Sequence, residues 1–284
     1  MALPAFAIYS FLYLYPSISN LWNSTKRWDG VTPPEFIGAR NFTYLATNDD
    51  LFLKVVGNNF RFAFVVVVLQ TSLSLLFATF LLKNTKTTIF LRVVYFFPTI
   101  LSSVSVGLIW LFLYNPNYGL INATGKSIGL MNEPGINWLG DGRFALYAIA
   151  ITQVWFHTGQ MMVVYIAGLQ QIPKELYEAA EVDGASPLRI YRSIALPLSR
   201  PAMGATAIFL FVINWNDLLW PLLLIQESDK KTLPLAMLAY RGEYFVSFSM
   251  LFTAVMVASL PMVIMYLMMQ RSFIAGLTAG AVKG

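Results

Sequence analysis

Long apolar runs recur along this chain, and they constrain its fold more than any other feature. A helix needs about twenty apolar residues to cross the hydrocarbon core of a bilayer, and runs of that size occur six times. Backbone groups in lipid must be hydrogen-bonded internally and alternating short strands are absent, so each run is expected to form one helix. The predicted spans are residues 3–22, 57–82, 93–114, 144–169, 202–225 and 248–269.

The composition agrees with a polytopic membrane protein. Of the 284 residues, 57 % are hydrophobic and 12 % are charged, far outside the range of soluble globular domains. The absence of cysteine excludes disulfides and zinc–thiolate clusters. The net charge of +5 is dispersed, with no basic block, so membrane lipid is expected as a partner and nucleic acid is not. We expect one all-α membrane domain over residues 1–284, whose first apolar run is a retained span.

A polar island separates the fourth and fifth apolar runs. Pro173 suits the start of a helix, where its missing N–H is not needed, and Gly184 offers the left-handed conformation that ends a helix. Ser186 is then expected to cap a second short helix that begins at Pro187, and residues 196–197 to close it. The pattern predicts a helix, a glycine elbow and a second helix along one membrane face, suited to docking a soluble partner.

This island resembles the EAA signature of permease subunits of ATP-driven, binding-protein-dependent importers. Glu178, Ala179 and Ala180 are followed by Gly184 and then by residues 194–197, so every fixed position of the signature is filled. The resemblance implies the type I fold of ATP-binding-cassette (ABC) importers, with six transmembrane helices. Residues 171–200 would hold a cytoplasmic coupling helix seated in a groove of a separate ATPase. The implied coupling residues are Glu178, Ala179, Ala180, Asp183 and Gly184, with Glu178 as the ion-pairing residue.

Further motifs resemble carbohydrate-importer permeases. The F-x-G-x-x-N pattern at Phe36, Gly38 and Asn41 resembles the segment after the first span in large, MalF-type subunits of maltose importers. The run NWNDLLWPL at 214–222 and the tail QRSF with GLTAGAVKG are more similar to small, MalG-type subunits. We favour the large-type position, and the alternative stays open.

Polar side chains are concentrated in two of the predicted spans. The fourth holds Gln153, His157 and Gln160 within two turns, and the fifth holds Asn-Trp-Asn-Asp at 214–217. Polar groups at membrane depth normally face a bundle interior or a cavity, and the hydroxyls after Pro98, which should bend the third span, are expected to do the same. The resemblance to large subunits implies that the sugar pathway is formed by Thr99, Ser103, Phe156, His157, Gln160, Asn214 and Asp217. In a small-type subunit these residues would line the cavity without touching substrate.

The resemblance implies a permease that forms half of a translocation pathway for an oligosaccharide or related sugar. It would lie in the plasma membrane of a bacterium or archaeon, with both termini and a glycine-rich tail at 270–284 in the cytoplasm. The implied partners are a second permease in a heterodimer, two ATPase subunits and an extracytoplasmic solute-binding protein. ATP and Mg²⁺ would bind the ATPases, leaving this chain without a cofactor, a metal or a catalytic residue.

The sequence leaves two other functional classes to consider. A proton-coupled secondary transporter would use Asp217 and His157 as relay groups, although inverted repeats with broken helices are not evident. An enzyme is disfavoured because G-x-S-x-G, H-E-x-x-H and paired spanning aspartates are absent. The fragment GKS at 125–127 is not a phosphate loop, since position 120 is leucine rather than glycine. The carboxylate of Asp217 argues mildly against a polyanionic substrate.

Overall fold

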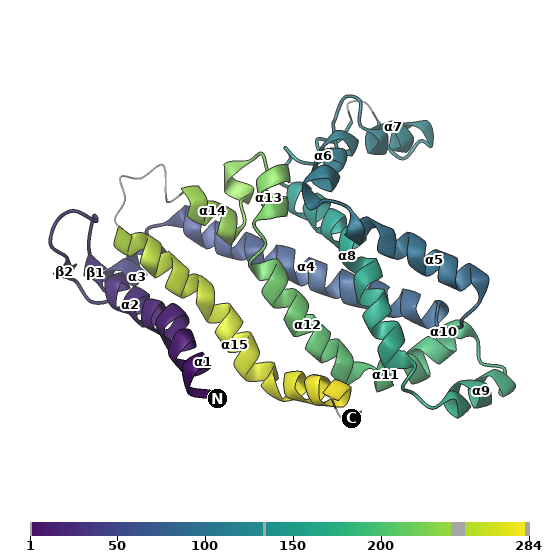
Figure 1. The fold of residues 1–284 in the computed structure, drawn as a ribbon. Helices are drawn as coiled ribbons and strands as arrows, with labels where there is room; N and C mark the ends of the chain where they lie inside the picture. Colours follow the sequence, from purple (N-terminus) through teal and green to yellow (C-terminus); the bar gives the residue numbers. More distant parts are fainter. Residues whose placement is uncertain (1, 133–134, 240–247, 282–284) are drawn as a thin grey trace. The chain divides into compact units, whose positions relative to one another are not determined.

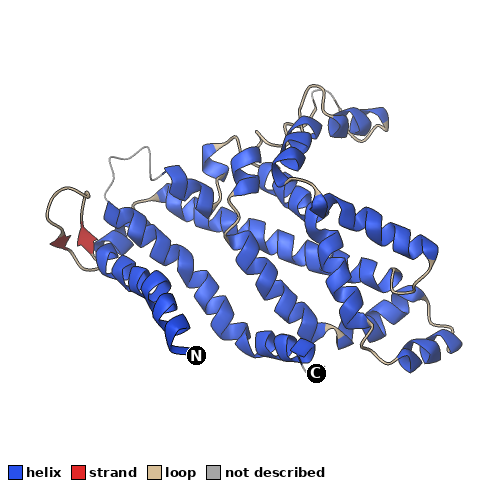
Figure 2. Cartoon of the chain, in the orientation of Figure 1, coloured by secondary structure: helices blue, strands red, loops and turns tan. Residues whose placement is uncertain are grey.

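The computed structural model describes residues 2–132, 135–239 and 248–281, and these ranges are mostly helical (Figure 2). Within them the only strands are β1 (Lys26–Arg27) and β2 (Glu35–Phe36), which pair antiparallel with Lys26 opposite Phe36. The chain divides into two compact units. The first comprises Met1–Asn59 and Asp229–Ile264, and the second comprises Phe60–Ser228 and Met265–Gly284.

The first unit opens with a helix that contains one π turn. Its parts are α1 (Ala2–Tyr9), the π turn η1 (Ser10–Leu14) and α2 (Tyr15–Ser24). The first apolar run is therefore helical but is not one uninterrupted α-helix. The unit also contains α3 (Arg40–Thr47), most of the 3-10 turn η4 (Ser228–Lys230), α14 (Leu233–Ala239), the start of α4 (Asp50–Phe80) and the start of α15 (Phe248–Ala281).

The F-x-G-x-x-N pattern holds this first unit together. Gly38 has a φ of 64°, a left-handed conformation that favours glycine. The buried Asn41 donates through Nδ2 to the carbonyl oxygens of Ser24 at 2.8 Å and Lys26 at 2.7 Å. Thr253 on α15 donates to the same Ser24 oxygen at 3.2 Å. One asparagine thus ties the end of α2 to the β1–β2 hairpin, beside a contact from α15.

The second unit is built around α8 (Ala145–Leu169), which corresponds closely to the fourth apolar run. One apolar cluster packs Ile149 and Phe156 of α8 with Phe62 and Trp220, and a second packs Met162 and Leu169 with Leu75 and Ala195. In Figure 1, α8 lies between α5 and α12. The other elements are α5 (Lys86–Phe96), η2 (Phe97–Ile100), α6 (Ser103–Leu113), α7 (Leu120–Ser127), α9 (Lys174–Val182), α10 (Pro187–Ile190), η3 (Tyr191–Ala195), α11 (Leu196–Leu198), α12 (Arg200–Trp215) and α13 (Leu219–Leu224).

Two apolar runs are broken rather than forming single helices. In the third, Lys86–Ile100 meets Ser103–Leu113 at 97°, and the break includes the 3-10 turn at Pro98, where proline cannot donate a backbone hydrogen bond. In the fifth, α12 ends at Trp215 and α13 begins at Leu219. The expectation of one helix per run is wrong at both places.

Side chains account for the break in the fifth run. Asn214 and Asn216 each donate through Nδ2 to the carbonyl four residues earlier, both at 2.7 Å. Asp217 Oδ1 then accepts a hydrogen bond from Leu219 N at 3.1 Å, at the start of α13. Short polar side chains that bond to nearby backbone groups compete with continued helix, and here they separate α12 from α13.

By length and hydropathy, two described helices could cross a membrane, Asp50–Phe80 and Phe248–Met268, and up to four could if each of two bent pairs forms one span. Helix α8 is 25 residues long but less hydrophobic than these, since polar residues such as Gln153 and Gln160 lower its hydropathy. The backbone of α15 continues to Ala281. The predicted glycine-rich tail at 270–284 is therefore helical over its described part, and residues 282–284 lie outside the described ranges.

Candidate functional site

A buried hydrogen bond joins the polar clusters of the fourth and fifth apolar runs. Gln153 Nε2 on α8 donates to Asn214 Oδ1 on α12 at 3.0 Å, and the two residues are 3 % and 1 % exposed. Gln153 Oε1 is buried without a hydrogen-bond partner among the described residues. A buried polar atom is costly unless it is paired, so this place favours a polar ligand or water. We call Gln153, Asn214 and Asp217 the polar junction.

Asp217 is the acidic member of the polar junction. One carboxylate oxygen, Oδ1, caps the first turn of α13 through Leu219 N. The other, Oδ2, is buried and has no hydrogen-bond partner among the described residues. An ionised carboxylate can accept several hydrogen bonds, so Asp217 can serve as a cap and still accept a bond from a further donor.

An aromatic wall adjoins the polar junction. The Phe156 ring meets Trp220 edge to face at 5.2 Å and meets the neighbouring His157 ring at 4.6 Å. Thr99 Oγ1 donates to the carbonyl oxygen of Phe156 at 2.8 Å, which attaches η2 to α8. The Thr99 hydroxyl group thus donates its proton to a backbone hydrogen bond, although the hydroxyl oxygen can still accept another hydrogen bond.

The remaining two predicted pathway residues stand apart from this group. Ser103 begins α6 and is half-buried, whereas Gln160 is exposed on α8. Among the described residues, neither makes a hydrogen bond to the other five. The structure therefore groups Thr99, Phe156, His157, Asn214 and Asp217 around the α8–α12–α13 contact, but not Ser103 or Gln160.

The polar island forms the predicted helix, glycine elbow and second helix. Helix α9 follows Pro173, and Gly184 has a φ of 72°. Ser186 Oγ accepts a hydrogen bond from Arg189 N at 3.4 Å, and Pro187 opens α10. This second helix continues through the π turn η3 and α11 and ends at Leu198, one residue beyond the predicted close at residues 196–197. Pro197 has no N–H to donate, and the π turn η3 ends two residues before it.

The predicted coupling residues are largely exposed. Glu178, Ala179, Asp183 and Gly184 are exposed and Ala180 is half-buried. Beside the elbow is a hollow of about 190 Å³ whose lining includes Ala180, Asp183 and Arg189. Asp183 and Arg189 are both exposed, so an acid and a base flank this hollow.

Residues 70–275 match the family described as the binding-protein-dependent transport system inner membrane component. This chain belongs to that family. The permease is therefore a multi-pass transport subunit of the inner membrane, not an enzyme, and it carries no cofactor of its own. The importer resemblance is confirmed, and the proton-coupled alternative is not retained.

Similar proteins include carbohydrate permeases. The permease is 34 % identical over 205 residues to the trehalose/maltose transport system permease protein MalF of Thermococcus litoralis, over 72 % of this chain and 68 % of that protein. It is 33 % identical over 214 residues to the diacetylchitobiose uptake system permease protein NgcF of Streptomyces coelicolor, over 72 % of this chain and 60 % of that protein.

A solved structure shows the same fold. A chain in the crystal structure of a bacterial alginate ABC transporter, in complex with an alginate pentasaccharide-bound periplasmic protein, matches with a TM-score of 0.77. The match covers 94 % of this chain and 90 % of that chain at 18 % identity. The permease thus has the fold of an ABC importer permease.

Sequence reasoning missed two members of the permease's candidate site. Gln153 was recognised in the polar run of the fourth span but was not assigned to the pathway, although it lies one helical turn before His157. Trp220 was recognised only as part of a family run, yet its ring contacts Phe156. Helical spacing could have indicated Gln153, whereas the Trp220 contact depends on how α13 packs against α8.

Proposed function

We propose that this permease forms half of the translocation pathway for a carbohydrate in an ABC importer. The polar junction beside the aromatic wall carries this proposal. A sugar presents hydroxyl groups that need both donors and acceptors and a C–H face that packs on aromatic rings. Gln153, Asn214 and Asp217 supply the polar groups, with Phe156 and Trp220 next to them. The substrates named for the trehalose/maltose and diacetylchitobiose relatives support the same substrate class.

We propose six transmembrane spans with both termini in the cytoplasm of a bacterium or archaeon. The six apolar runs support this topology. The proposed partners are a second permease in a heterodimer, two ATPase subunits that bind ATP and Mg²⁺, and an extracytoplasmic solute-binding protein. The family description supports dependence on a binding protein.

The connections of the coupling segment, residues 171–200, suggest how ATP hydrolysis would reach the pathway. Helix α8 ends at Leu169, five residues before α9 begins, and α11 ends at Leu198, two residues before α12 begins. An ATPase that moves α9–α11 would therefore pull on the two helices joined by Gln153 and Asn214. Glu178 is the proposed ion-pairing residue at the ATPase surface.

The coupling segment can be tested with ATP hydrolysis by the reconstituted complex of both permeases, the ATPases and the loaded binding protein. Glu178→Lys should abolish binding-protein-stimulated hydrolysis while leaving the second permease bound. If Glu178→Lys stimulates and transports as the wild type does, the proposed coupling role is wrong.

Gly184 offers a matched pair of variants. A Cβ at this position meets nothing within 4 Å, so only its φ of 72° resists substitution. Left-handed backbone costs an ordinary L-residue about 1–2 kcal/mol, and asparagine tolerates it better. Gly184→Ala should therefore impair stimulated hydrolysis more than Gly184→Asn. Equal activity in the two variants would show that the elbow conformation does not matter for coupling.

A further inference from the structure

A second cavity lies away from the candidate pathway residues, at the end of α6 and the loop that follows it. Its volume is about 430 Å³, within the range of about 300–1,000 Å³ typical of small-molecule sites. It lies wholly within the second unit. None of its lining residues is a predicted pathway or coupling residue.

Two exposed rings form an aromatic part of this cavity. Phe112 is 58 % exposed and Tyr118 is 62 % exposed, and their ring centroids are 5.3 Å apart at an interplanar angle of 44°. Tyr114 also lines the cavity, but its hydroxyl already donates to the carbonyl oxygen of Ala148 at 2.8 Å. Tyr114 therefore contributes a fixed ring, while Phe112 and Tyr118 remain available to stack on a ligand.

Three amides supply the polar part of the lining. Asn115 Oδ1 accepts from Asn117 N at 2.9 Å, and Asn137 Oδ1 accepts from Gly140 N at 3.0 Å. These bonds fix each amide and leave its Nδ2 group without a hydrogen-bond partner among the described residues. Gln226 is the third amide. Amides offer both donors and acceptors, which sugar hydroxyls require.

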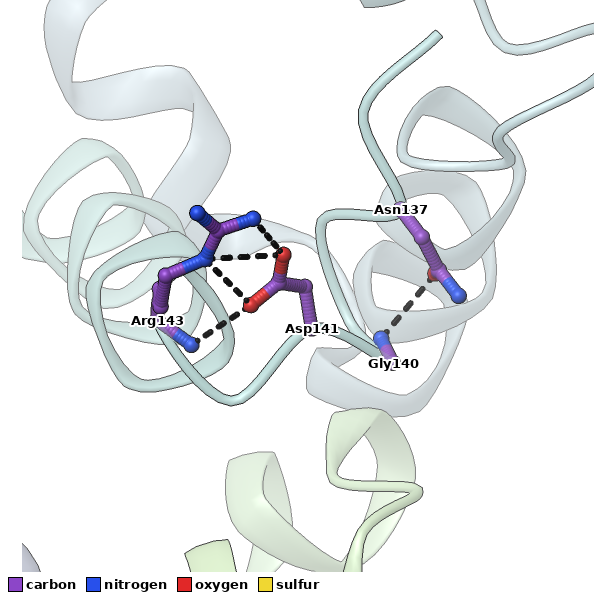
Figure 3. Close-up of polar contacts among 4 residues, drawn as sticks. All are labelled: Asn137, Gly140, Asp141 and Arg143. Carbon is purple, nitrogen blue, oxygen red and sulfur yellow. Dashed lines mark hydrogen bonds and ion pairs between the residues drawn. The ribbon is translucent and has the colours of Figure 1, made fainter. Parts of the chain in front are cut away.

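The loop around Asn137 is held in shape by its own contacts (Figure 3). Arg143 binds the Asp141 carboxylate with Nε at 3.1 Å and 3.2 Å and with Nη2 at 2.6 Å. A Cβ at Gly140 would lie 2.4 Å from Asn137 Nδ2, so a larger residue there would displace the Asn137 amide. The hydrogen bonds and negative charge of Asp141 raise the pKa of Arg143. Neither residue lines the cavity.

We propose that this cavity is a subsite for a neutral saccharide ring, which binds there before it reaches the polar junction. The other lining residues are three leucines and a proline, so no described lining residue is charged. A uronate or phosphate ester would find no counter-charge there, whereas a neutral sugar could use both the rings and the amides. The proposal rests on the proposed function and on the topology that places this loop opposite the coupling segment.

Helix α6 connects the subsite with the candidate pathway. Phe112 lies near its end and Ser103 at its start, and nine residues of helix rise about 14 Å. Ser103 therefore lies about 14 Å along the helix axis from the Phe112–Tyr118 rings.

The test is photolabelling of the complete importer with a diazirine derivative of maltotriose, followed by peptide mapping by mass spectrometry. We expect labelled peptides from residues 108–118 and 137–139. Excess maltotriose should remove the label, and trigalacturonate of the same length should not. Tyr118→Ala should lower the labelling about tenfold, and Tyr118→Phe should restore most of it because the ring is retained. Tyr147→Ala, which removes an exposed tyrosine outside the cavity, is the control and should not change the labelling.

Other results would overturn the subsite. Labelling confined to α8, α12 and α13 would reject the subsite while leaving the proposed function intact. If excess maltotriose does not reduce the labelling at residues 108–118, the probe binds this surface nonspecifically. If trigalacturonate competes as well as maltotriose does, the site does not select neutral saccharides. Failure of the proposed function itself would look different, because the importer would then transport no saccharide at all.

Discussion

A Cβ atom added to Gly159 on α8 would lie 1.9 Å from the backbone carbonyl oxygen of Tyr95 on α5. The two helices therefore meet backbone to backbone at this glycine, as small residues allow in membrane proteins. Nearby, Ser74 Oγ on α4 donates to the carbonyl oxygen of Thr158 at 3.0 Å. Together these contacts fix the part of α8 that carries Phe156 and His157.

The first prediction concerns this contact. Gly159→Ala should force α5 and α8 apart and lower the free energy of unfolding by about 1–3 kcal/mol, the usual effect of overpacking. Gly168→Ala is the matched control on the same helix, because a Cβ there meets nothing within 4 Å. Thermal unfolding in detergent measures both. Gly168→Ala should leave the melting temperature unchanged or raise it, and equal destabilisation by the two variants would contradict the predicted backbone contact.

The second prediction concerns the Gln153–Asn214 hydrogen bond. Gln153→Leu and Asn214→Leu should each lower the free energy of unfolding of the permease. The double variant should lose less than the two single losses added together. Hydrogen bonds between membrane helices have average coupling energies of about 0.6 kcal/mol and reach about 1.7 kcal/mol. A double-mutant cycle of thermal unfolding measures this coupling. Gln160→Leu on the exposed side of α8 should have little effect on stability, and additive effects of the first two substitutions would mean that the bond contributes nothing.

Local signals explain which parts of the fold were predictable. Pro173, Gly184 and the Ser186-Pro187 pair act within a few residues, and each has the predicted role in the helix–elbow–helix element. Pro98 predicted a bend but not its angle of 97°. The break after Trp215 was missed because hydropathy ignores bonds such as that from Asn216 Nδ2 to the carbonyl oxygen of Val212.

The candidate site was less predictable than the fold. Polar density in two apolar runs predicted that His157 and Asn214 belong to one region, and the structure joins these runs through Gln153 and Asn214. The pairing of Gln153 with Asn214 joins residues 61 positions apart, and it depends on how α8 is rotated against α12. A sequence pattern does not specify this rotation, so only the structure identifies the hydrogen-bond partner of Gln153.

The third prediction concerns pH and the loop that follows α2. Asp29 Oδ1 accepts hydrogen bonds from Val31 N at 3.0 Å, from Thr32 N at 2.8 Å and from Thr32 Oγ1 at 2.8 Å. These bonds, led by the one from Thr32 N, lower the pKa of Asp29 from 3.8 to about 2. Bonds to a carboxylate favour its charged form, so their stabilising effect is complete above pH 3.8 and disappears as the pH falls through about 2.

Proteolysis can follow this titration. Below pH 3.8 the loop at residues 29–32 should become progressively easier for an acid-active protease to cleave. Asp29→Asn should weaken the loop at neutral pH and remove most of the pH dependence, because an amide oxygen accepts more weakly and does not titrate in this range. If wild type and Asp29→Asn show the same cleavage between pH 5 and pH 2, the loop is not held by this carboxylate.

The last prediction concerns an ion pair between the coupling segment and the α4–α5 turn. Lys83 Nζ lies 2.8 Å from Glu181 Oε1 on α9. The turn itself is held by Arg92, whose guanidinium donates to the carbonyl oxygens of Leu81 at 2.9 Å and Leu82 at 3.1 Å. The Lys83 and Glu181 side chains are 75 % and 48 % exposed, so the pair should add less than about 1 kcal/mol to stability. Its expected role is to hold α9 in position against the rest of the second unit.

Lys83→Glu should therefore lower the amount of sugar transported per ATP hydrolysed while leaving the melting temperature nearly unchanged. The double variant Lys83→Glu, Glu181→Lys should recover much of the loss, because it restores the pair with reversed charges. Lys86→Glu is the matched control, since Lys86 is exposed and makes no ion pair among the described residues. The difference between Lys83→Glu and wild type should shrink in high salt, which screens exposed charges. A double variant no better than Lys83→Glu would show that each side chain acts separately, for instance at the ATPase surface, and that the ion pair does not position α9.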